Sequence, residues 1–301
     1  MGDSPEDLDL RLVRCFTVLA EHGHFGRAAD ALHLTQSSLS RQINRLEQQV
    51  GARLLDRGPR GSRLTEAGEV FLPLATAVLR SSAQAATRAR AAARPSRVTI
   101  GYVANIIVTP AVRELRHRHP DADVRTLHLD WTEPRAALLD HRVDAVVARL
   151  PFPTDQLHVT VLYDEPRALL VPVDHRLAGK ESITLDDIAD EPLPRAADPA
   201  WDAFWRIDPR PDGRPAPDGP LIDAIEDKLE LVASGQAVAI VPAGSGISGL
   251  RADLTAIPLD GVEPCHVVLA TRADDRSRLV AAFRKYAHDH LTGTGPAPLS
   301  L

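Results

Sequence analysis

The fold is decided by residues 25–68, FGRAADALHLTQSSLSRQINRLEQQVGARLLDRGPRGSRLTEAG. The centre of this stretch predicts a helix over residues 36–50. Its apolar residues recur at spacings of four, three and four, at Leu39, Ile43, Leu46 and Val50. This spacing places them on one helical face. The opposite face repeats the spacing with polar side chains, at Ser37, Arg41, Asn44 and Gln48. The pattern therefore predicts a helix with one buried stripe and one exposed, hydrogen-bonding stripe.

The flanking residues place this helix in a small motif. Thr35 is a favourable N-cap, and Leu34 and Leu39 have the spacing of a hydrophobic staple. Two further helices are expected upstream, over residues 9–21 and 25–32. Downstream, residues 54–64 read as a hairpin with a Gly-Pro-Arg-Gly tip. Two helices, a short turn and a capped third helix form a helix-turn-helix, and the hairpin adds a wing.

A helix-turn-helix inserts its second helix into the major groove, where the N-terminal residues of that helix reach base edges. Arginine pairs with guanine, glutamine pairs with adenine, and serine suits phosphate. Arginines on the hairpin are placed to reach the DNA backbone or a minor groove. The alternative is a plain helical bundle with a solvated polar face, which explains neither the capped turn nor the arginine-bearing hairpin. The predicted DNA contacts are Gln36, Ser37, Ser38, Ser40, Arg41, Arg57, Arg60 and Arg63.

The charge distribution indicates that the two parts of the chain have different partners. The 301-residue chain has a formal net charge of −6, but residues 1–94 carry 13 arginines against 10 acidic residues and no lysine. A basic segment joined to an acidic body indicates that only the basic segment binds phosphates.

No apolar run is long enough for a membrane helix, and the acidic N-terminus is not a secretory signal. The two cysteines, Cys15 and Cys265, are too few for a disulfide framework or a zinc cage. We therefore expect a cytoplasmic protein with reduced thiols and no membrane partner.

The remainder of the chain changes pattern twice. Residues 66–93 predict one long helix, and from residue 98 the pattern becomes strand-helix-strand. Strands are expected over residues 98–103, 124–129, 143–148, 159–163, 168–173, 237–241 and 266–270. Helices are expected over residues 108–119, 132–141, 221–233 and 276–291. This alternation is typical of a parallel α/β sheet. Between Pro192 and Pro220 lie eight prolines, and there the pattern predicts no regular element.

Residues 25–68 closely resemble the N-terminal signature of LysR-type transcriptional regulators. Segments such as RVDAVVARL and LVASGQAVAIVPAG fall where that family has its effector-domain segments. One departure is Ser37, where the family often has proline. The resemblance implies an α/β protein with an N-terminal winged helix-turn-helix (1–65), a linker helix for dimerisation (66–94) and a two-lobed effector-binding domain similar to periplasmic binding proteins (95–301). Lobe I is expected over about 95–163 and 268–293, and lobe II over about 164–267.

The resemblance also implies a ligand between the lobes. The positions that correspond to its contacts are Val103, Ala104, Asn105, Trp131, Thr132, Arg149 and Arg195. Many relatives have a hydroxyl residue in the loop that here reads Val-Ala-Asn, and this chain has no hydroxyl there. Asn105, Thr132 and Arg149 are therefore the candidates for binding an anion. The expected partners are double-stranded DNA, a small-molecule effector and further copies of the chain, as a homodimer or homotetramer. RNA polymerase is a further candidate partner.

Two other readings of the sequence remain open. The first is a dinucleotide-dependent enzyme built on residues 95–291, since residues 244–249 match GxGxxG. A lone match is weak, Pro242 interrupts the turn, and no set of catalytic residues stands out. The His-x-His pairs lack further ligands at metal spacing. We therefore expect no catalysis, no metal and no cofactor. The second alternative is an architectural DNA-binding protein with a vestigial cleft.

Overall fold

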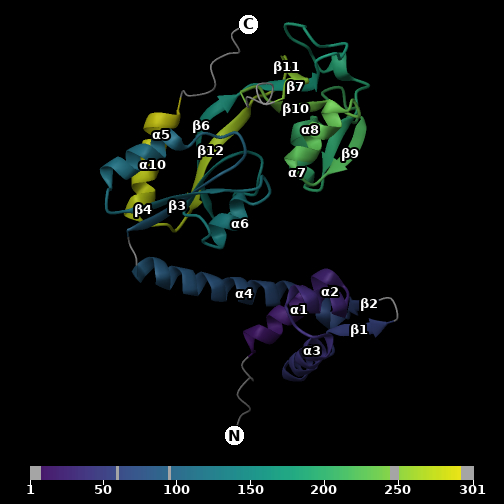
Figure 1. Cartoon of the computed structure of the whole chain (residues 1–301), viewed down its shortest axis with the longest axis vertical. Coiled ribbons are helices and arrows are strands. Elements are labelled where there is room, and N and C mark those ends of the chain that lie inside the picture. The colour runs from purple at the N-terminus through teal and green to yellow at the C-terminus, as the bar shows by residue number, and fades with distance from the viewer. Residues whose placement is uncertain (1–7, 59–60, 94–95, 245–250, 293–301) are drawn as a thin grey trace. The chain divides into compact units, whose positions relative to one another are not determined.

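The computed structural model describes residues 8–58, 61–93, 96–244 and 251–292. The chain forms two compact units, Met1–Ala92 and Ala93–Leu301 (Figure 1). Among the described residues, no helix has both the length and the hydropathy needed to cross a membrane. Each unit has its own hydrophobic core.

The first unit begins with three short helices whose ends follow the sequence signals. They are α1 (Leu10–His22), α2 (Phe25–Ala31) and α3 (Gln36–Val50). The predicted cap of α3 is confirmed, because the Thr35 hydroxyl accepts a hydrogen bond from the Ser38 backbone N–H at 3.2 Å. Gly51 ends α3 in the left-handed region at φ +74°. The predicted apolar stripe packs into the core of the unit, where Leu39, Ile43 and Leu46 are fully buried.

The predicted hairpin is present as β1 (Leu55–Gly58) paired antiparallel with β2 (Gly61–Leu64). It lies against the end of α1, where the Ser62 backbone N–H donates to the Gly23 carbonyl oxygen at 3.0 Å. A Cβ at Gly61 would lie 2.6 Å from that same oxygen, and Gly61 has φ +123°. Only glycine fits this position, so the hairpin is held close to the three helices.

The long helix α4 (Glu66–Ala93) starts against Leu54, the residue that precedes the hairpin strand β1. A Cβ on Gly68 would lie 2.1 Å from the Leu54 carbonyl oxygen, which is part of the backbone and cannot move aside alone. The Thr65 hydroxyl accepts a hydrogen bond from the Gly68 backbone N–H at 3.1 Å and so caps the helix. The close approach therefore fixes the first turn of α4 against the rest of the unit.

We expect Gly68→Ala to lower the free energy of unfolding of this unit by about 2 kcal/mol or more, because the added methyl overpacks the contact. At an exposed position inside a helix, the same change would raise the free energy of unfolding by up to about 1 kcal/mol. The measurement is urea unfolding of the full chain followed by far-ultraviolet circular dichroism. Ser82→Ala, at an exposed position of α4, is the control. A Gly68→Ala protein as stable as wild type would contradict the contact.

In the second unit, lobe I is built on a five-stranded sheet with the order β4-β3-β5-β12-β6. Strand β3 runs parallel to β4 and β5, as predicted, whereas β12 is antiparallel to β5 and β6. The strands are β3 (Arg97–Tyr102), β4 (Asp123–His128), β5 (Ala145–Arg149), β6 (Leu157–Glu165) and β12 (Cys265–Arg272). The helices are α5 (Thr109–Arg118), α6 (Pro134–Leu139) and α10 (Arg278–Leu291). Buried Val, Ile, Leu and Ala residues form the core.

Lobe II has a three-stranded antiparallel sheet with the order β10-β7-β11 and a parallel pair, β8-β9. The strands are β7 (Arg167–Pro172), β8 (Leu193–Ala196), β9 (Asp218–Ile222), β10 (Ala239–Pro242) and β11 (Leu254–Pro258). The helices are α7 (Pro199–Arg206), α8 (Ile225–Ala233) and the 3₁₀ turn η1 (Asp186–Ile188). The chain enters lobe II directly after β6 and returns to lobe I at β12, as Figure 1 shows.

The proline-rich region contains three elements that the sequence pattern did not predict: β8, α7 and the start of β9. The buried guanidinium of Arg206 organises them, since it contacts Asp202, Asp208 and Asp218. It also donates to the carbonyl oxygens of Ala216 and Pro217. The predicted helix over residues 221–233 is wrong at its start, because residues up to Ile222 belong to β9 and α8 begins at Ile225.

Candidate functional site

The exposed face of α3 presents the first group of predicted contact residues. Gln36, Ser37 and Arg41 are exposed, whereas Ser38 and Ser40 are half-buried. The Arg41 guanidinium makes no hydrogen bond or ion pair with any other described residue. The face is therefore rich in hydrogen-bonding groups at the N-terminal half of the helix, where the backbone N–H groups also favour anions.

The hairpin contributes one described arginine. Arg63 is exposed on β2, next to the end of the strand. The side chain of Arg57 and the whole of Arg60 lie outside the described residues, so their roles stay predictions.

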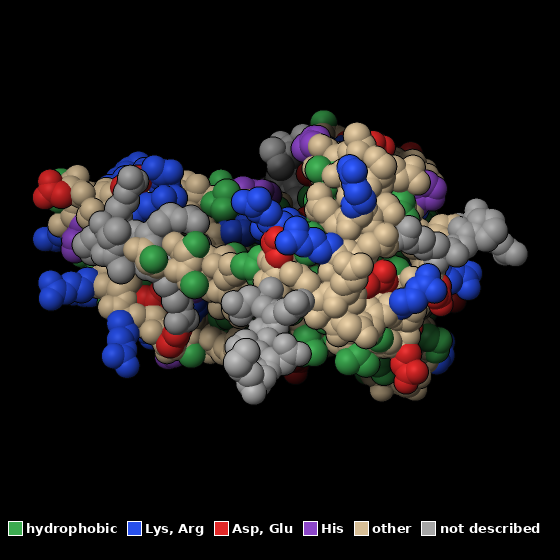
Figure 2. Space-filling model, turned by 90° about the horizontal axis from the view of Figure 1, so that it is seen from below, with side chains coloured by type: hydrophobic (Ala, Val, Ile, Leu, Met, Phe, Trp, Pro, Cys, Tyr) green, Lys and Arg blue, Asp and Glu red, His purple; other side chains and the backbone are tan. Residues whose placement is uncertain are grey.

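Hydrophobic side chains are visible among basic ones on the face drawn in Figure 2. In the first unit, three large exposed ones lie on α4: Val70 is 64% exposed, Leu74 60% and Val78 41%. Their four-residue spacing places them along one side of the helix. A largely exposed apolar helix side of this kind is suited to a partner surface.

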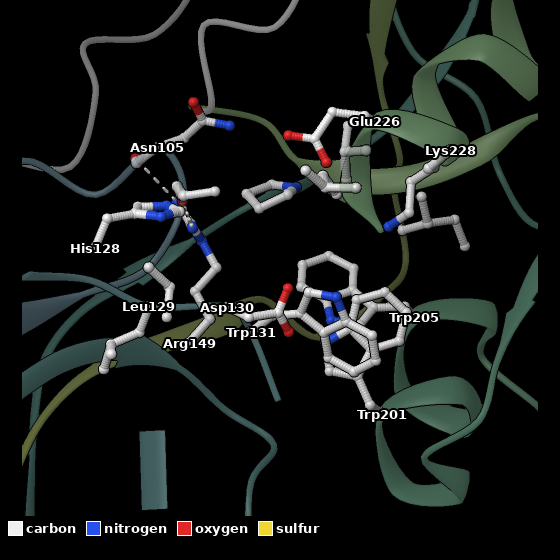
Figure 3. A pocket seen from close by; sticks show the side chains of 16 residues that line it. Asn105, His128, Leu129, Asp130, Trp131, Arg149, Trp201, Trp205, Glu226 and Lys228 are labelled. Atoms are coloured by element: carbon white, nitrogen blue, oxygen red, sulfur yellow. Dashed lines mark hydrogen bonds between the residues drawn. The ribbon is translucent and has the colours of Figure 1, made fainter. Parts of the chain in front are cut away.

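A pocket in the second unit lies between the two lobes (Figure 3). Its cavity volume is about 130 Å³, and its lining is mainly apolar and aromatic. Lobe I contributes Val103, Ala104, Asn105, His128, Leu129, Asp130, Trp131 and Arg149. Lobe II contributes Trp201, Trp205, Ile225, Glu226, Lys228, Ile240, Val241 and Pro242. The structure therefore brings five of the seven predicted effector contacts to one pocket: Val103, Ala104, Asn105, Trp131 and Arg149.

The other two predicted contacts do not line this pocket. The Thr132 hydroxyl donates to the Asp130 carboxylate at 2.7 Å. Arg195 donates to the Gly219 carbonyl oxygen at 3.1 Å and lies 3.6 Å from the Asp218 carboxylate. Both side chains are therefore engaged with neighbours in their own lobe.

Arg149 lines the pocket, but each of its three side-chain nitrogens already donates within lobe I. Its Nε lies 2.6 Å from a Glu165 carboxylate oxygen, and its exposed fraction is only 10%. Its two terminal nitrogens donate to the carbonyl oxygens of Ala104 and Asn105, the contact drawn as dashed lines in Figure 3. The charge of Arg149 is thus compensated by Glu165, and its geometry fixes the loop after β3.

All three tryptophans of the chain meet at the pocket. The ring centres of Trp131, from lobe I, and Trp201, from lobe II, are 4.1 Å apart, and those of Trp201 and Trp205 are 5.9 Å apart. Sequence reasoning selected Trp131 but missed Trp201 and Trp205, which lie on α7 in the proline-rich region. The available signal was Asp198-Pro199, a helix start in which Asp198 caps α7 through the Trp201 backbone N–H at 2.9 Å.

Sequence reasoning also missed Lys228, on α8. Its side chain is 5% exposed, and its Nζ lies 4.6 Å from the centre of the Trp201 ring. Among the described residues, no carboxylate or other hydrogen-bond acceptor binds its ammonium group. Burial alone lowers the pKa of Lys228 to about 8. The pocket therefore contains one compensated cation, Arg149, and one uncompensated cation, Lys228.

The histidines, the cysteines and the glycine-rich segment are the remaining signals from the sequence. Within the described part of the chain, no group of three His, Cys, Asp or Glu side chains could hold a metal ion. His24 caps α2 by accepting from the Gly26 backbone N–H. Both cysteines are buried, and burial raises the pKa of Cys265 to about 12, so this thiol stays protonated. Most of the GxGxxG segment lies outside the described residues.

The chain is similar to known proteins along both units. Residues 10–69 match the family described as "Bacterial regulatory helix-turn-helix protein, lysR family", and residues 91–292 match "LysR substrate binding domain". The HTH-type transcriptional regulator AlsR of Bacillus subtilis (strain 168) is 34% identical over 203 residues, which are 66% of this chain and 67% of AlsR. The probable cat1 operon transcriptional activator of Acinetobacter lwoffii is 31% identical over 298 residues, 92% of this chain and 94% of that protein.

Solved structures extend the likeness to the fold. The crystal structure of CbnR, a LysR family transcriptional regulator, superposes with a TM-score of 0.60 at 22% identity. The superposition covers 93% of this chain and 98% of CbnR. The winged helix-turn-helix, the long helix and the two-lobed α/β unit therefore occur together in a protein of known structure.

Proposed function

The chain belongs to the LysR family of bacterial transcriptional regulators, and from this premise we propose which of its residues bind DNA and which bind its effector. The regulator binds DNA through α3, with Gln36, Ser37, Ser38, Ser40 and Arg41 directed to the major groove. Arg57, Arg60 and Arg63 reach the backbone or a minor groove from the hairpin. The observation that carries this assignment is the exposed polar side of α3, on which Arg41 has no bond to another described residue.

We expect Arg41→Ala to weaken binding to a specific site by about 1–3 kcal/mol while leaving non-specific binding nearly unchanged. The reason is that an arginine on base edges contributes to specificity, whereas phosphate contacts supply most of the general affinity. The measurement is fluorescence anisotropy with the region upstream of the protein's own gene across a salt series. Arg278→Ala, which removes an exposed arginine of α10 in the other unit, is the control. Equal losses on specific and unrelated DNA would contradict base readout by Arg41.

The proposed assembly is a dimer formed through α4, with a tetramer as the higher form. Its support is the stripe of Val70, Leu74 and Val78, which needs an apolar partner. A second copy of the same helix offers the same stripe, so two-fold pairing buries both at once. Two α3 helices would then read a site with two half-sites. RNA polymerase is the proposed further partner, and the cytoplasm the proposed location.

The pocket between the lobes is the proposed effector site. A ligand that contacts both lobes favours the arrangement in which they close on it, and so shifts the population of states that bind DNA. The relatives named above are transcriptional regulators, and we propose no catalytic step for this chain. An architectural DNA-binding protein would instead keep the same DNA affinity whichever metabolite is added.

A further inference from the structure

Of the chain's three lysines, Lys228 alone is buried. A buried ammonium group without a counter-charge is unfavourable, because burial removes its hydration, and no hydrogen-bond acceptor among the described residues replaces it. The rings of Trp201 and Trp205, at 4.6 and 5.9 Å from Nζ, offset only part of that loss. Figure 3 shows the amino group directed toward these rings and into the pocket.

The surroundings of Lys228 do not supply the missing charge. The Glu226 carboxylate lines the same pocket, but it is exposed and makes no bond to Lys228. The Asp130 carboxylate accepts from the backbone and side chain of Thr132. Glu165 is bound to Arg149. Each of these three described carboxylates is therefore solvated or already paired, and the ammonium group is available to a ligand.

We propose that Lys228 is the residue that binds the anionic group of the effector, and that the effector is a small carboxylate whose flat apolar body packs on the tryptophan cluster. This inference rests on the effector role proposed above for the pocket. It assigns the anion contact to lobe II, to a residue on α8, rather than to Arg149, Thr132 or Arg195.

The size and lining of the pocket support the flat apolar body. The cavity volume of about 130 Å³ is close to the roughly 150 Å³ of an apolar cavity that accepts benzene. Trp131, Trp201 and Trp205 provide ring faces, and Val103, Leu129 and Ile240 close the remainder with aliphatic groups. Aromatic rings prefer offset or tilted contacts with one another, which the cluster already shows.

The first test compares carboxylates with their uncharged analogues. The probes are a panel of one-ring carboxylates, each paired with its primary amide, which has nearly the same shape and no charge. Binding to the full chain is measured by calorimetry and by the rise in melting temperature. We expect carboxylates to bind wild type at least ~10-fold more tightly than their amides, as for a charge-assisted hydrogen bond.

The substitution Lys228→Met keeps an unbranched side chain that is one atom shorter, and it removes the charge. We expect it to weaken carboxylate binding at least ~10-fold and to leave amide binding unchanged. Lys285→Met, which makes the same change at an exposed position of α10, should behave as wild type. Retention of the carboxylate preference by Lys228→Met would overturn the proposal. So would a wild type that binds no panel carboxylate at millimolar concentration.

A second readout separates a binding role from a structural one. Without ligand, Lys228→Met should melt at a higher temperature than wild type, because it removes an uncompensated buried charge. The unfolded chain has the ordinary lysine pKa of 10.5, whereas burial lowers the pKa of Lys228 to about 8. Between these values the unfolded chain holds a proton that the folded chain lacks, so wild type gains stability as pH rises. The advantage of Lys228→Met should therefore shrink from pH 8 to pH 10.5.

The comparison isolates Lys228 because the other charged or titratable groups that line the pocket are present in both proteins; they are His128, Asp130, Arg149 and Glu226. A lower melting temperature for Lys228→Met would mean that the lysine stabilises the packing of α7 against α8 instead.

Failure of this inference is distinguishable from failure of the proposed function. If the chain selects specific DNA and an uncharged ligand alters that binding, the regulator stands and only the assignment of Lys228 falls.

Discussion

Replacing Leu74 with glutamate is expected to lower the affinity of the chain for a DNA site with two half-sites by ~100-fold or more, since linked binding of two modules contributes factors of that size. Leu74 is 60% exposed at the centre of the apolar stripe on α4. In a two-fold pair of helices, glutamates at this position would face an apolar surface and each other. The dimer should dissociate, and each monomer would then bind one half-site alone.

The measurements are the molar mass in solution by sedimentation and the affinity for one and for two half-sites. Thr76→Glu adds the same charge at an exposed position on the opposite side of α4, so it should leave both quantities unchanged. If Leu74→Glu stays dimeric and binds the two-half-site DNA as wild type does, the assembly uses another surface.

Replacing Glu165 with alanine is expected to lower the free energy of unfolding of the second unit by about 3–5 kcal/mol, because it leaves the buried Arg149 without its counter-charge. Glu165 is 2% exposed and Arg149 10% exposed, so both charged groups are largely shielded from water. The loop after β3 should also loosen, since Arg149 holds it through the carbonyl oxygens of Ala104 and Asn105.

Tryptophan fluorescence during urea unfolding measures this effect, because Trp131, Trp201 and Trp205 all lie in the second unit. The double substitution Arg149→Met with Glu165→Leu removes both charges together and should recover most of the loss. A single Glu165→Ala protein within about 1 kcal/mol of wild type would show that the pair is well hydrated and weakly coupled.

Sequence patterns predicted best the parts whose structure depends on interactions between residues close in the sequence. The cap at Thr35, the stripe from Leu39 to Leu46 and the hairpin after Leu54 depend on spacing alone, and all are present. The parallel order of β4, β3 and β5 follows in the same way from alternating elements. In these regions local preference and tertiary packing agree.

The proline-rich region shows why the rest could not be predicted. There α7 and β9 depend on Arg206, whose carboxylate partners are spread over seventeen residues from Asp202 to Asp218. No periodicity marks such a cluster, so Trp201 and Trp205 were not assigned to the pocket. The pairing of Arg149 with Glu165 is likewise a contact between β5 and β6, and the spacing of residues along the chain does not reveal it. The same holds for Lys228, whose exceptional feature is the absence of a hydrogen-bond or ion-pair partner among the described residues.

Selection of genomic DNA fragments by the purified full chain tests whether the chain reads DNA sequence through α3. Wild type and Arg41→Ala would be run side by side, and the retained fragments sequenced. We expect wild type to enrich one motif with two related half-sites, and Arg41→Ala to lose this enrichment while still retaining DNA. If wild type enriches no motif, or Arg41→Ala enriches the same one equally, readout of DNA sequence by Arg41 of α3 is wrong.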